Sequence, residues 1–469
     1  MMWTALLLSR VQFAFTVSFH IIFPSFTIGV AAWLTVLEAF HLISGKPVYR
    51  RLFEFWLKIF GVTFGLGVVS GIVLAFEFGM NWSRLSEVTG PIQGPLLTYE
   101  SFTAFALEAS FFGVLLFGRS RVRPVVYLFS TMMVALGTTF SAFWIMVNNS
   151  WMQAPVGYAI QNGVFVPTDW TAIIFSPVVW VRFPHMLIAA YLTGAFCVAA
   201  TGAWYRLRGI YAAEGRVMLR MGLFLAALLI PVQLFLGHLN GDYVHDRQPA
   251  KFAAIEGRWH DEQPAGEVLI AIPDAARETN HFELKIPYLG SLIASMRLNS
   301  RETGLRSFAR EDRPPVAIPF FAFRVMVGCG LLMMALAWLG SLYLLLDRKP
   351  GQRLLLWATF LSFPLPFIAT LTGWFTAEMG RQPWSVYGAL RTADAVTPTL
   401  SVQAVTISLI IFVAVYVVIF SFGTLYVYRL LKAGPVESQP ILPLNPKRPL
   451  GLTGGGNPVV ETTQEGAWL

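Results

Sequence analysis

Nine apolar stretches, each long enough to cross a lipid bilayer, constrain this chain more than any other feature of its sequence. A helix that spans a hydrocarbon core of about 30 Å needs about 20 apolar residues. The stretches do not alternate apolar and polar residues as the strands of a membrane barrel do. We therefore predict an all-α integral membrane protein with nine transmembrane helices, near residues 14–40, 54–80, 97–118, 124–150, 180–205, 217–238, 319–346, 353–377 and 400–431.

The composition of the chain also favours lipid as its solvent. Charged residues make up 13% of the 469 residues and the mean hydropathy is +0.60, whereas soluble domains carry roughly 25% charged residues. The net charge is +8, but the basic residues form no patch with interleaved aromatic residues of the kind that binds nucleic acid. We therefore expect the lipid bilayer to be a partner of this chain and nucleic acid not to be one.

Basic residues gather in alternate loops, and this sets the direction of the chain. The loops after the first, third, fifth and seventh stretches each hold several Lys or Arg residues, among them Arg50 and Arg121. The short loops on the other side hold only Arg84, Arg381 and Arg391. Because cytoplasmic loops carry the excess of Lys and Arg, we predict that the N-terminus lies outside and the C-terminus in the cytoplasm.

These features divide the chain into four segments, namely transmembrane residues 1–238, an outer loop of residues 239–318, transmembrane residues 319–432 and a tail of residues 433–469. The outer loop is far longer than ordinary connections, and loops of this length are commonly functional. Amphipathic stretches at residues 266–272 and 286–297 predict local structure within it. The tail is rich in Pro and Gly, which predicts a disordered cytoplasmic end.

Ionisable side chains inside membrane spans are costly and are functional candidates by default. On the predicted orientation His20, Glu100, His185 and Glu378 lie toward the outer surface, and so does the thioether of Met326. Scattered structural residues would not gather at one depth. The pattern therefore predicts a binding site in the outer leaflet, beneath the outer loop.

Other ionisable residues of the spans have different expected roles. Glu108 lies about 12 Å deeper than Glu100 on nearly the same face of its helix, so the two carboxyl groups are candidates for proton transfer. Glu38 and Glu77 lie near span ends, where a carboxylate can reach water along the helix. For these two we expect no special function.

Histidine, methionine and carboxylate side chains in apolar surroundings suit haem iron, for which His and Met form a known axial pair. A single methionine in an apolar helix is more often a packing residue. Two other functions fit the same residues. A proton-coupled transporter would use Glu100 and Glu108 without His185 and Met326, and a haem-anchoring electron-transfer subunit without oxygen chemistry would not need Glu378.

One motif narrows these alternatives. Residues 373–384 read GWFTAEMGRQPW, which resembles the GWxxxExGRQPW signature of subunit I of the cytochrome bd-type quinol oxidases. Further matches are Phe323-Arg324-x-Met326-x-Gly328, Trp151-Met152-Gln153-x-Pro155-x-Gly157, and Gly241-Asp242 followed by Gln248-Pro249-x-Lys251. Nine spans with a long outside loop after the sixth also resemble this family.

The resemblance implies two b haems and one d haem. His185 and Met326 would be the axial ligands of a low-spin b haem, and Arg324 would lie beside that haem and stabilise its reduced state electrostatically. His20 and Glu378 would hold the high-spin pair at which oxygen reacts. The remaining residues at the haems would be Glu100, Trp374 and Arg381.

The same resemblance implies a terminal respiratory oxidase of the bacterial inner membrane, with Glu100, Glu108 and Glu378 as its catalytic residues. Ubiquinol or menaquinol would be oxidised at the outer face, with Lys251 and Glu256 of the outer loop at the quinol. Dioxygen would be reduced to water with protons from the cytoplasm, relayed by Glu108. A second large membrane subunit, and in some members a small one-span subunit, would complete the enzyme.

The outer loop of this chain lacks the long insertion of many family members. It resembles the short-loop members, among them the cyanide-insensitive oxidases. In some of these a b haem replaces haem d.

Overall fold

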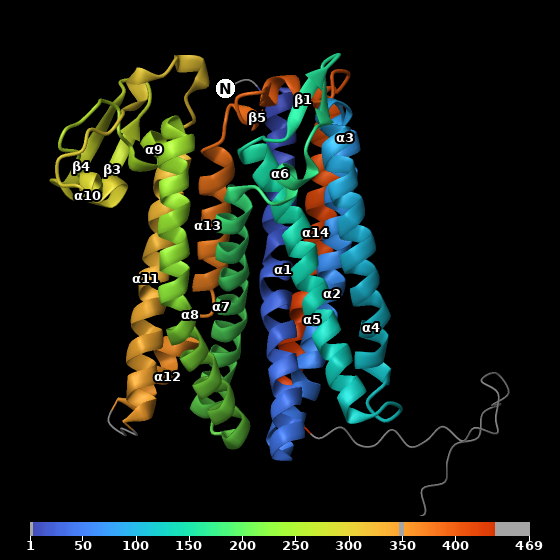
Figure 1. Ribbon diagram of the computed structural model, residues 1–469. Helices are drawn as coiled ribbons and strands as arrows, with labels where there is room; N and C mark the ends of the chain where they lie inside the picture. The colour runs from blue at the N-terminus through green and yellow to red at the C-terminus, as the bar shows by residue number, and fades with distance from the viewer. Residues whose placement is uncertain (1–2, 347–350, 437–469) are drawn as a thin grey trace, which may run out of the picture. The chain divides into compact units, whose positions relative to one another are not determined.

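The computed structural model describes residues 3–346 and 351–436, and its helices run side by side as a bundle of long rods (Figure 1). Within these residues nine segments are long and apolar enough to cross a membrane, which confirms the prediction. The spans are α1 (Ala5–Ser44), α2 (Pro47–Met80), α3 with α4 (Ser83–Tyr99 and Ala106–Phe117), α5 (Pro124–Gln153), α6 with α7 (Trp170–Ile174 and Pro177–Arg208), α8 (Ala212–Arg247), α11 (Ala317–Leu345), α12 with α13 (Gln352–Leu361 and Leu365–Met379) and α14 (Val402–Ala433).

The helices extend well beyond the apolar stretches that predicted them. α1 begins at Ala5, where the hydroxyl of Thr4 accepts a hydrogen bond from the backbone N–H of Leu7 at 3.1 Å, and it ends before Gly45 in the left-handed conformation, with φ +65°. His20 therefore lies about four turns inside its helix. The direction of the bundle across the membrane stays a prediction.

The third span is not a uniform α-helix. A π-helical segment, η1 (Glu100–Phe105), joins α3 to α4. π-helical turns are rare and are frequently found at functional sites. Here the turn begins at Glu100, one of the two carboxylates that the sequence placed on this span.

The connections contain short strands and helices that the all-α prediction did not include. They are three antiparallel hairpins, β1 with β2 (Tyr158–Gln161 and Val164–Pro167), β3 with β4 (Glu267–Asp274 and Thr279–Ile286) and β5 with β6 (Trp384–Val386 and Leu390–Arg391), the helices α9 (Pro249–Glu256) and α10 (Leu289–Ser295), and the 3-10 turns η2 (Leu305–Ser307), η3 (Arg310–Asp312) and η4 (Thr392–Asp394). The stretch at residues 266–272 forms most of β3, and the stretch at residues 286–297 covers α10. Of the predicted tail, residues 437–469 lie outside the described residues.

The first and fifth spans approach each other closely. A Cβ atom built on Gly194 of α7 would lie 2.8 Å from the carbonyl carbon of Gly29 on α1, which is closer than two such atoms can pack. Small residues at a crossing let helix backbones touch, and this favours association within a membrane. The glycine pair therefore fixes α1 against α7, the helices that carry His20 and His185.

Candidate functional site

His20 on α1 presents one ring nitrogen for coordination. Its Nδ1 lies 3.0 Å from the hydroxyl oxygen of Ser70 on α2, and that hydroxyl donates to the carbonyl of Gly67 at 2.9 Å. Because the Ser70 proton is already used, Nδ1 of His20 must carry the proton and donate it. The lone pair then resides on Nε2. Histidine ligands of metals commonly donate their other N–H in this way.

His185 on α7 contacts Gln233, and two polar atoms at this contact lack hydrogen-bond partners among the described residues. Its Nε2 lies 3.3 Å from the amide nitrogen of Gln233 on α8. Its Nδ1 and the amide oxygen of Gln233 are buried without a hydrogen-bond partner among the described residues. Native structures rarely leave buried polar atoms unpaired, so two at one contact indicate a site that a ligand completes.

Each of the three predicted axial ligands lies against a glycine of a neighbouring helix. A Cβ atom at Gly71 would lie 3.2 Å from the ring of His20, and one at Gly237 would lie 3.3 Å from the ring of His185. Glycine at these two positions therefore leaves room for the histidine rings. A Cβ atom on Gly373 of α13 would similarly lie 2.9 Å from the sulfur of Met326 on α11.

Glu378, at the end of α13, is buried in a hydrogen-bonded network. Its carboxylate accepts from the amide of Asn149 at 3.0 Å and from the amide of Gln153 at 3.2 Å, both on α5. Arg381 pairs with its other oxygen, and Arg182 of α7 donates to the side-chain oxygen of Asn149 at 2.6 Å. Three donors thus fix the position of this carboxylate, and Arg182 orients one of them, Asn149.

Lys251 of α9 joins the same network. Its ammonium donates to the side-chain oxygen of Gln153 at 3.1 Å, although the ammonium is almost fully buried. Burial lowers the pKa of Lys251 to about 7, and the nearby Arg182 adds to this effect. Three cationic side chains, Arg182, Lys251 and Arg381, thus face the single carboxylate of Glu378.

Glu256 lies at the other end of α9, beside a second carboxyl group that the sequence did not single out. Burial and the carboxylate of Glu256 raise the pKa of Glu267 to about 9. Nη2 of Arg324 lies 3.7 Å from a carboxylate oxygen of Glu267, and Oε2 of Glu256 is buried without a partner among the described residues. Burial beside a second carboxyl group therefore favours the protonated form of Glu267 at neutral pH.

Arg324 connects this carboxyl pair to the helix of Met326. Its guanidinium donates to the carbonyl of Ile255 at 2.8 Å and to the carbonyls of Val268 and Leu269. It also stacks on the ring of Phe320, with 3.5 Å from Cζ to the ring centroid. Since Met326 is two residues further along α11, the loop and the candidate ligand are tied to one another.

Glu100 and Glu108 face the same neighbouring helix, as their spacing predicts. Ser141 of α5 donates to Glu100 at 2.7 Å, whereas a Cβ atom on Gly137, one turn away on α5, would run into the side chain of Glu108. Glu108 is almost fully buried. The two carboxyl groups therefore line one helix interface.

The expectation that Glu38 and Glu77 reach water from span ends is wrong, because both side chains are buried. Glu38 accepts from Nη2 of Arg119 at 2.6 Å, and this guanidinium also stacks on Tyr127. Glu77 accepts from the hydroxyl of Thr16 at 2.6 Å. Both carboxylates are internal polar contacts between spans.

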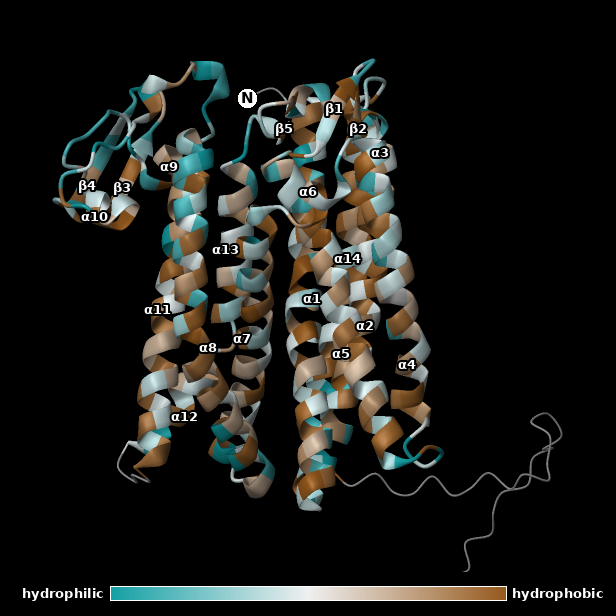
Figure 2. Cartoon of the chain, viewed as in Figure 1, coloured by the Kyte–Doolittle hydropathy of each residue, from teal (hydrophilic) through white to brown (hydrophobic). Residues whose placement is uncertain are grey.

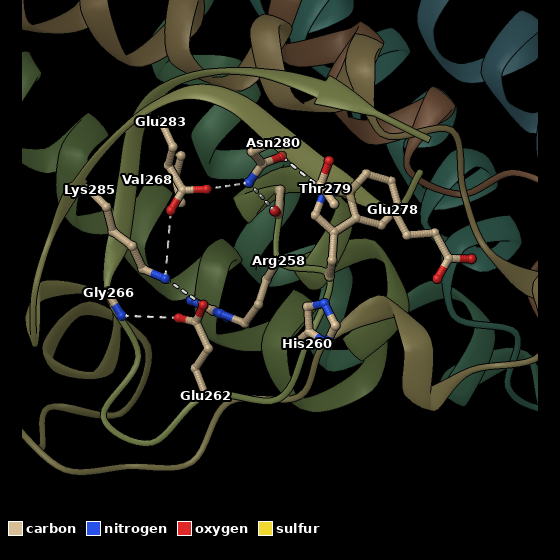
Figure 3. A pocket seen from close by; sticks show the side chains of 12 residues that line it. Arg258, His260, Glu262, Gly266, Val268, Glu278, Thr279, Asn280, Glu283 and Lys285 are labelled. Atoms are coloured by element: carbon tan, nitrogen blue, oxygen red, sulfur yellow. Dashed lines mark hydrogen bonds and ion pairs between the residues drawn. The ribbon is translucent and has the colours of Figure 1, made fainter. Parts of the chain in front are cut away.

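A separate polar pocket lies within the outer loop (Figure 3). Its wall contains Glu262, which precedes the hairpin and pairs with Lys285 of β4, and Asn280, which donates to Glu283 at 2.8 Å. Nη1 of Arg258 is buried there without a partner among the described residues. Thus polar groups of the hairpin point inward.

These residues fit haem in two respects. His20 and His185 have the nitrogen lone pairs or unpaired polar atoms, and Met326 the thioether, that haem iron accepts. In addition, Nε and Nη1 of Arg381 are buried without a partner among the described residues, beside an excess of positive charge that suits the propionate groups of haem. Trp374, also predicted at the haems, is partly exposed and contacts Phe375.

Sequence reasoning missed several residues of this site. Arg182 carried the signal that found the others, because a charge inside a span is a functional candidate. Gln153 stood within a motif that resembles the family. Asn149, Gln233 and Glu267 carried no signal, because only folding brings them to their partners.

Comparison with known proteins shows which family this chain belongs to. The family model of cytochrome bd terminal oxidase subunit I matches residues 8–435. Cytochrome bd ubiquinol oxidase subunit 1 of Bacillus subtilis is 34% identical, covering 91% of this chain and 93% of the relative. Cytochrome bd-II ubiquinol oxidase subunit 1 of Escherichia coli is 32% identical, covering 93% and 98%.

A solved structure is similar in fold. The bd oxidase of Geobacillus thermodenitrificans superposes with a TM-score of 0.85 at 27% identity, covering 92% of this chain and 99% of that one. This chain belongs to the cytochrome bd terminal oxidase subunit I family.

Proposed function

We propose that this chain oxidises quinol at its outer loop and delivers the electrons, by way of the His185 and Met326 site, to the His20 and Glu378 site, where dioxygen is reduced. Membership of the family makes it a quinol oxidase subunit, with haem cofactors, in the bacterial inner membrane. The proposal concerns which residues perform each step. It is supported by the contacts of Arg324, which join the outer loop to the span that carries Met326.

His185 and Met326 would hold a low-spin b haem, and His20 and Glu378 the high-spin pair, with Glu100, Trp374 and Arg381 beside them. When bound, these haems supply one-electron transfer and oxygen binding. Ser70 orients His20 by accepting its Nδ1 proton. Asn149 and Gln153 orient Glu378 by donating to its carboxylate.

Protons leave quinol as it is oxidised, and the loop provides acceptors for them. Burial beside Glu256 raises the pKa of Glu267, so Glu256 would be the group that takes up a proton from a quinol hydroxyl. The guanidinium of Arg324, 3.7 Å from Glu267, would supply a positive charge beside both carboxyl groups. Lys251, whose pKa lies near 7, can accept or donate a proton at neutral pH.

Protons consumed in water formation would come from the cytoplasm through Glu108. Its carboxyl group is buried against α5 and can hold a proton inside the membrane. Ser141 would pass the proton between this region and Glu100, because its hydroxyl contacts the Glu100 carboxylate. Quinol oxidised on one side and protons drawn from the other would separate charge across the membrane.

One observation carries the proposal furthest, namely that Arg324 contacts both the loop carboxyl pair and the backbone of the loop while standing two residues before Met326. A substrate at Glu256 would therefore be held beside the helix that carries a ligand of the first electron acceptor. The third cofactor would be haem d, or a b haem in its place as in some short-loop members of the family. A second large membrane subunit would complete the enzyme.

The purified enzyme tests the proposal by its dithionite-reduced minus air-oxidised spectrum and by quinol-dependent oxygen uptake. We expect b-type bands, with a chlorin-type red band only if haem d is present. Glu378→Ala should abolish oxygen uptake and alter the high-spin signals, while Glu87→Ala, on the exposed surface of α3, should leave both unchanged. Wild-type oxygen uptake by Glu378→Ala would overturn the assignment of Glu378.

A further inference from the structure

The hairpin of the outer loop exposes apolar residues on one face, and polar residues of its other face line the loop pocket. Ile270 and Leu284 face each other across β3 and β4 and are 63% and 54% exposed. Ile272 and Ile286, two residues further along each strand, lie on the same exposed face. An antiparallel hairpin in water normally shows the opposite arrangement, with its polar residues outward.

The opposite face of the hairpin carries polar side chains. Glu283 and Lys285, the residues on either side of Leu284, line the polar pocket within the loop (Figure 3). Lys285 pairs there with Glu262. Alternate side chains of β4 are thus polar toward the pocket and apolar toward the outside.

The apolar surface continues onto α10, which packs against β3 and α8. Ile293 and Met296 are exposed there, and Figure 2 shows hydrophobic colour on α10 and the neighbouring end of β3. We call Ile270, Ile272, Leu284, Ile286, Ile293 and Met296 the loop apolar face. Soluble surfaces rarely leave a contiguous patch of this kind uncovered.

Arg324 places this face beside a membrane span. Its guanidinium donates to the carbonyls of Val268 and Leu269 at the start of β3, and Arg324 lies about two turns inside α11. The hairpin therefore lies alongside α11, about 10 Å along that helix from its first residue. Phe321 and Val325, on either side of Arg324 in the sequence, are 45% and 44% exposed on this span.

The neighbouring surface therefore belongs to a transmembrane helix whose apolar side chains face lipid. α10 lies lower than α9 in Figure 1 and packs against α8, whose Phe235, about 18 Å before the end of that helix, is also exposed. The loop apolar face thus adjoins two helices that expose apolar side chains. Arg297, exposed directly after Met296, supplies a cation that can reach lipid phosphates from the edge of such a surface.

We propose that the loop apolar face lies in the lipid leaflet on the outer-loop side of the membrane, as an interfacial element of the protein. Lipid fits each feature named above, because the face is apolar, adjoins lipid-facing helices and has a cation at its edge. A quinol carries an apolar tail, so it would pass from this leaflet to Glu256 without crossing water. The membrane contact itself does not depend on quinol being the substrate.

Site-directed fluorescence in lipid nanodiscs tests this proposal with the holoenzyme. An environment-sensitive fluorophore is placed at Ile270→Cys and, separately, at Leu284→Cys, with Glu283→Cys as the matched control on the opposite face. Arg277→Cys, in the turn between the strands and 75% exposed at its side chain, reports water. The native Cys197 and Cys329 are replaced by serine or alanine, and unchanged haem spectra identify variants that fold.

Two quenchers then distinguish the occupants. We expect acyl-chain nitroxides to quench positions 270 and 284 severalfold more than position 277, and iodide in water to show the reverse order. Equal iodide quenching at 270, 284 and 277 would place the face in water and overturn the proposal. Shielding of 270 and 284 from both quenchers would also overturn it, because a protein partner would then cover the face.

Discussion

Lys251 and Glu378 share one side chain, that of Gln153. The ammonium of Lys251 donates to the amide oxygen of Gln153 at 3.1 Å, and the amide nitrogen of Gln153 donates to the carboxylate of Glu378 at 3.2 Å. A residue predicted at the quinol and one predicted at the oxygen site are therefore one amide apart. The outer loop and the end of α13 act as one polar unit.

Replacing this shared amide tests whether the unit matters for turnover. Gln153→Leu removes the hydrogen bond from Lys251 and one of the three donors to Glu378, and a buried polar group that loses its partner costs about 1–3 kcal/mol. Because about 1.4 kcal/mol corresponds to a tenfold change in rate, we expect quinol-dependent oxygen uptake to fall about 5- to 150-fold. Gln161→Leu, on an exposed strand position, is the control, and equal rates in both variants would contradict the prediction.

Met326 is the second test. Met326→Leu retains the shape of the side chain and removes the sulfur, so we expect the low-spin haem signal in the reduced spectrum to be lost or converted to a high-spin one. Met333→Leu, two turns further along α11 in a packed apolar cluster, should keep the signal. Low-spin spectra that are the same in both variants would show that Met326 only packs.

Glu267 should make stability depend on pH. Its pKa in the folded protein is about 9, raised by burial and by Glu256 from an ordinary value of 4.5. Between these values the unfolded chain is ionised and the folded chain is protonated, so stability falls as pH rises and levels off above about 9. Below 4.5 both states are protonated and the effect is absent.

Glu267→Gln removes this dependence, because glutamine does not ionise. The variant should therefore gain on the wild type as pH rises from 6 to 9, which thermal denaturation in detergent measures as a growing difference in midpoint. Glu283→Gln, on the neighbouring strand, is the control. Parallel curves of unfolding midpoint against pH for wild type and Glu267→Gln would refute the raised pKa of Glu267.

Glu108 should limit proton delivery without holding a haem. Glu108→Gln keeps the size of the side chain and removes its proton-carrying capacity, so we expect oxygen uptake to fall at least about tenfold, since general acid–base groups contribute about 10²–10⁴. Haem spectra should be unchanged. Glu87→Gln, an exposed carboxylate on the preceding helix, should retain full activity; loss of haem in Glu108→Gln would point to a structural role instead.

Glu38 and Arg119 form a contact whose loss should affect stability alone. Arg119 pairs with Glu38 at 2.6 Å, where the Glu38 side chain is 2% exposed, and stacks on Phe53 and Tyr127. Removing one partner of a buried pair costs about 3–5 kcal/mol. Glu38→Gln should lower the unfolding midpoint and leave the haem spectrum intact, whereas Glu87→Gln, from an exposed pair, should cost about 1 kcal/mol or less.

The spans could be predicted from sequence because lipid constrains each helix by itself, through its length and apolar character. The candidate ligands His20, His185 and Glu378 could be predicted because an ionisable group in a span is rare, and Met326 because a motif surrounds it. In both cases the signal is local in the chain.

The contacts that complete the site could not be predicted, because they depend on how distant segments meet. Glu267 pairs with Glu256 only after the hairpin folds back beneath α9, and Gln153 reaches Glu378 across more than two hundred residues. Glu38 was misjudged for the same reason, since Arg119 of another loop covers it. Position along a span gave no sign of that partner.

The close approach of Gly29 and Gly194 has a consequence for biosynthesis. α1 leaves the ribosome first, and the chain up to Gly194 needs on the order of ten seconds or more to follow. During that interval α1 lies without the helix that packs against Gly29. Substitutions at this crossing should therefore act on how much enzyme accumulates in the membrane, with little effect on the turnover of the molecules that do assemble.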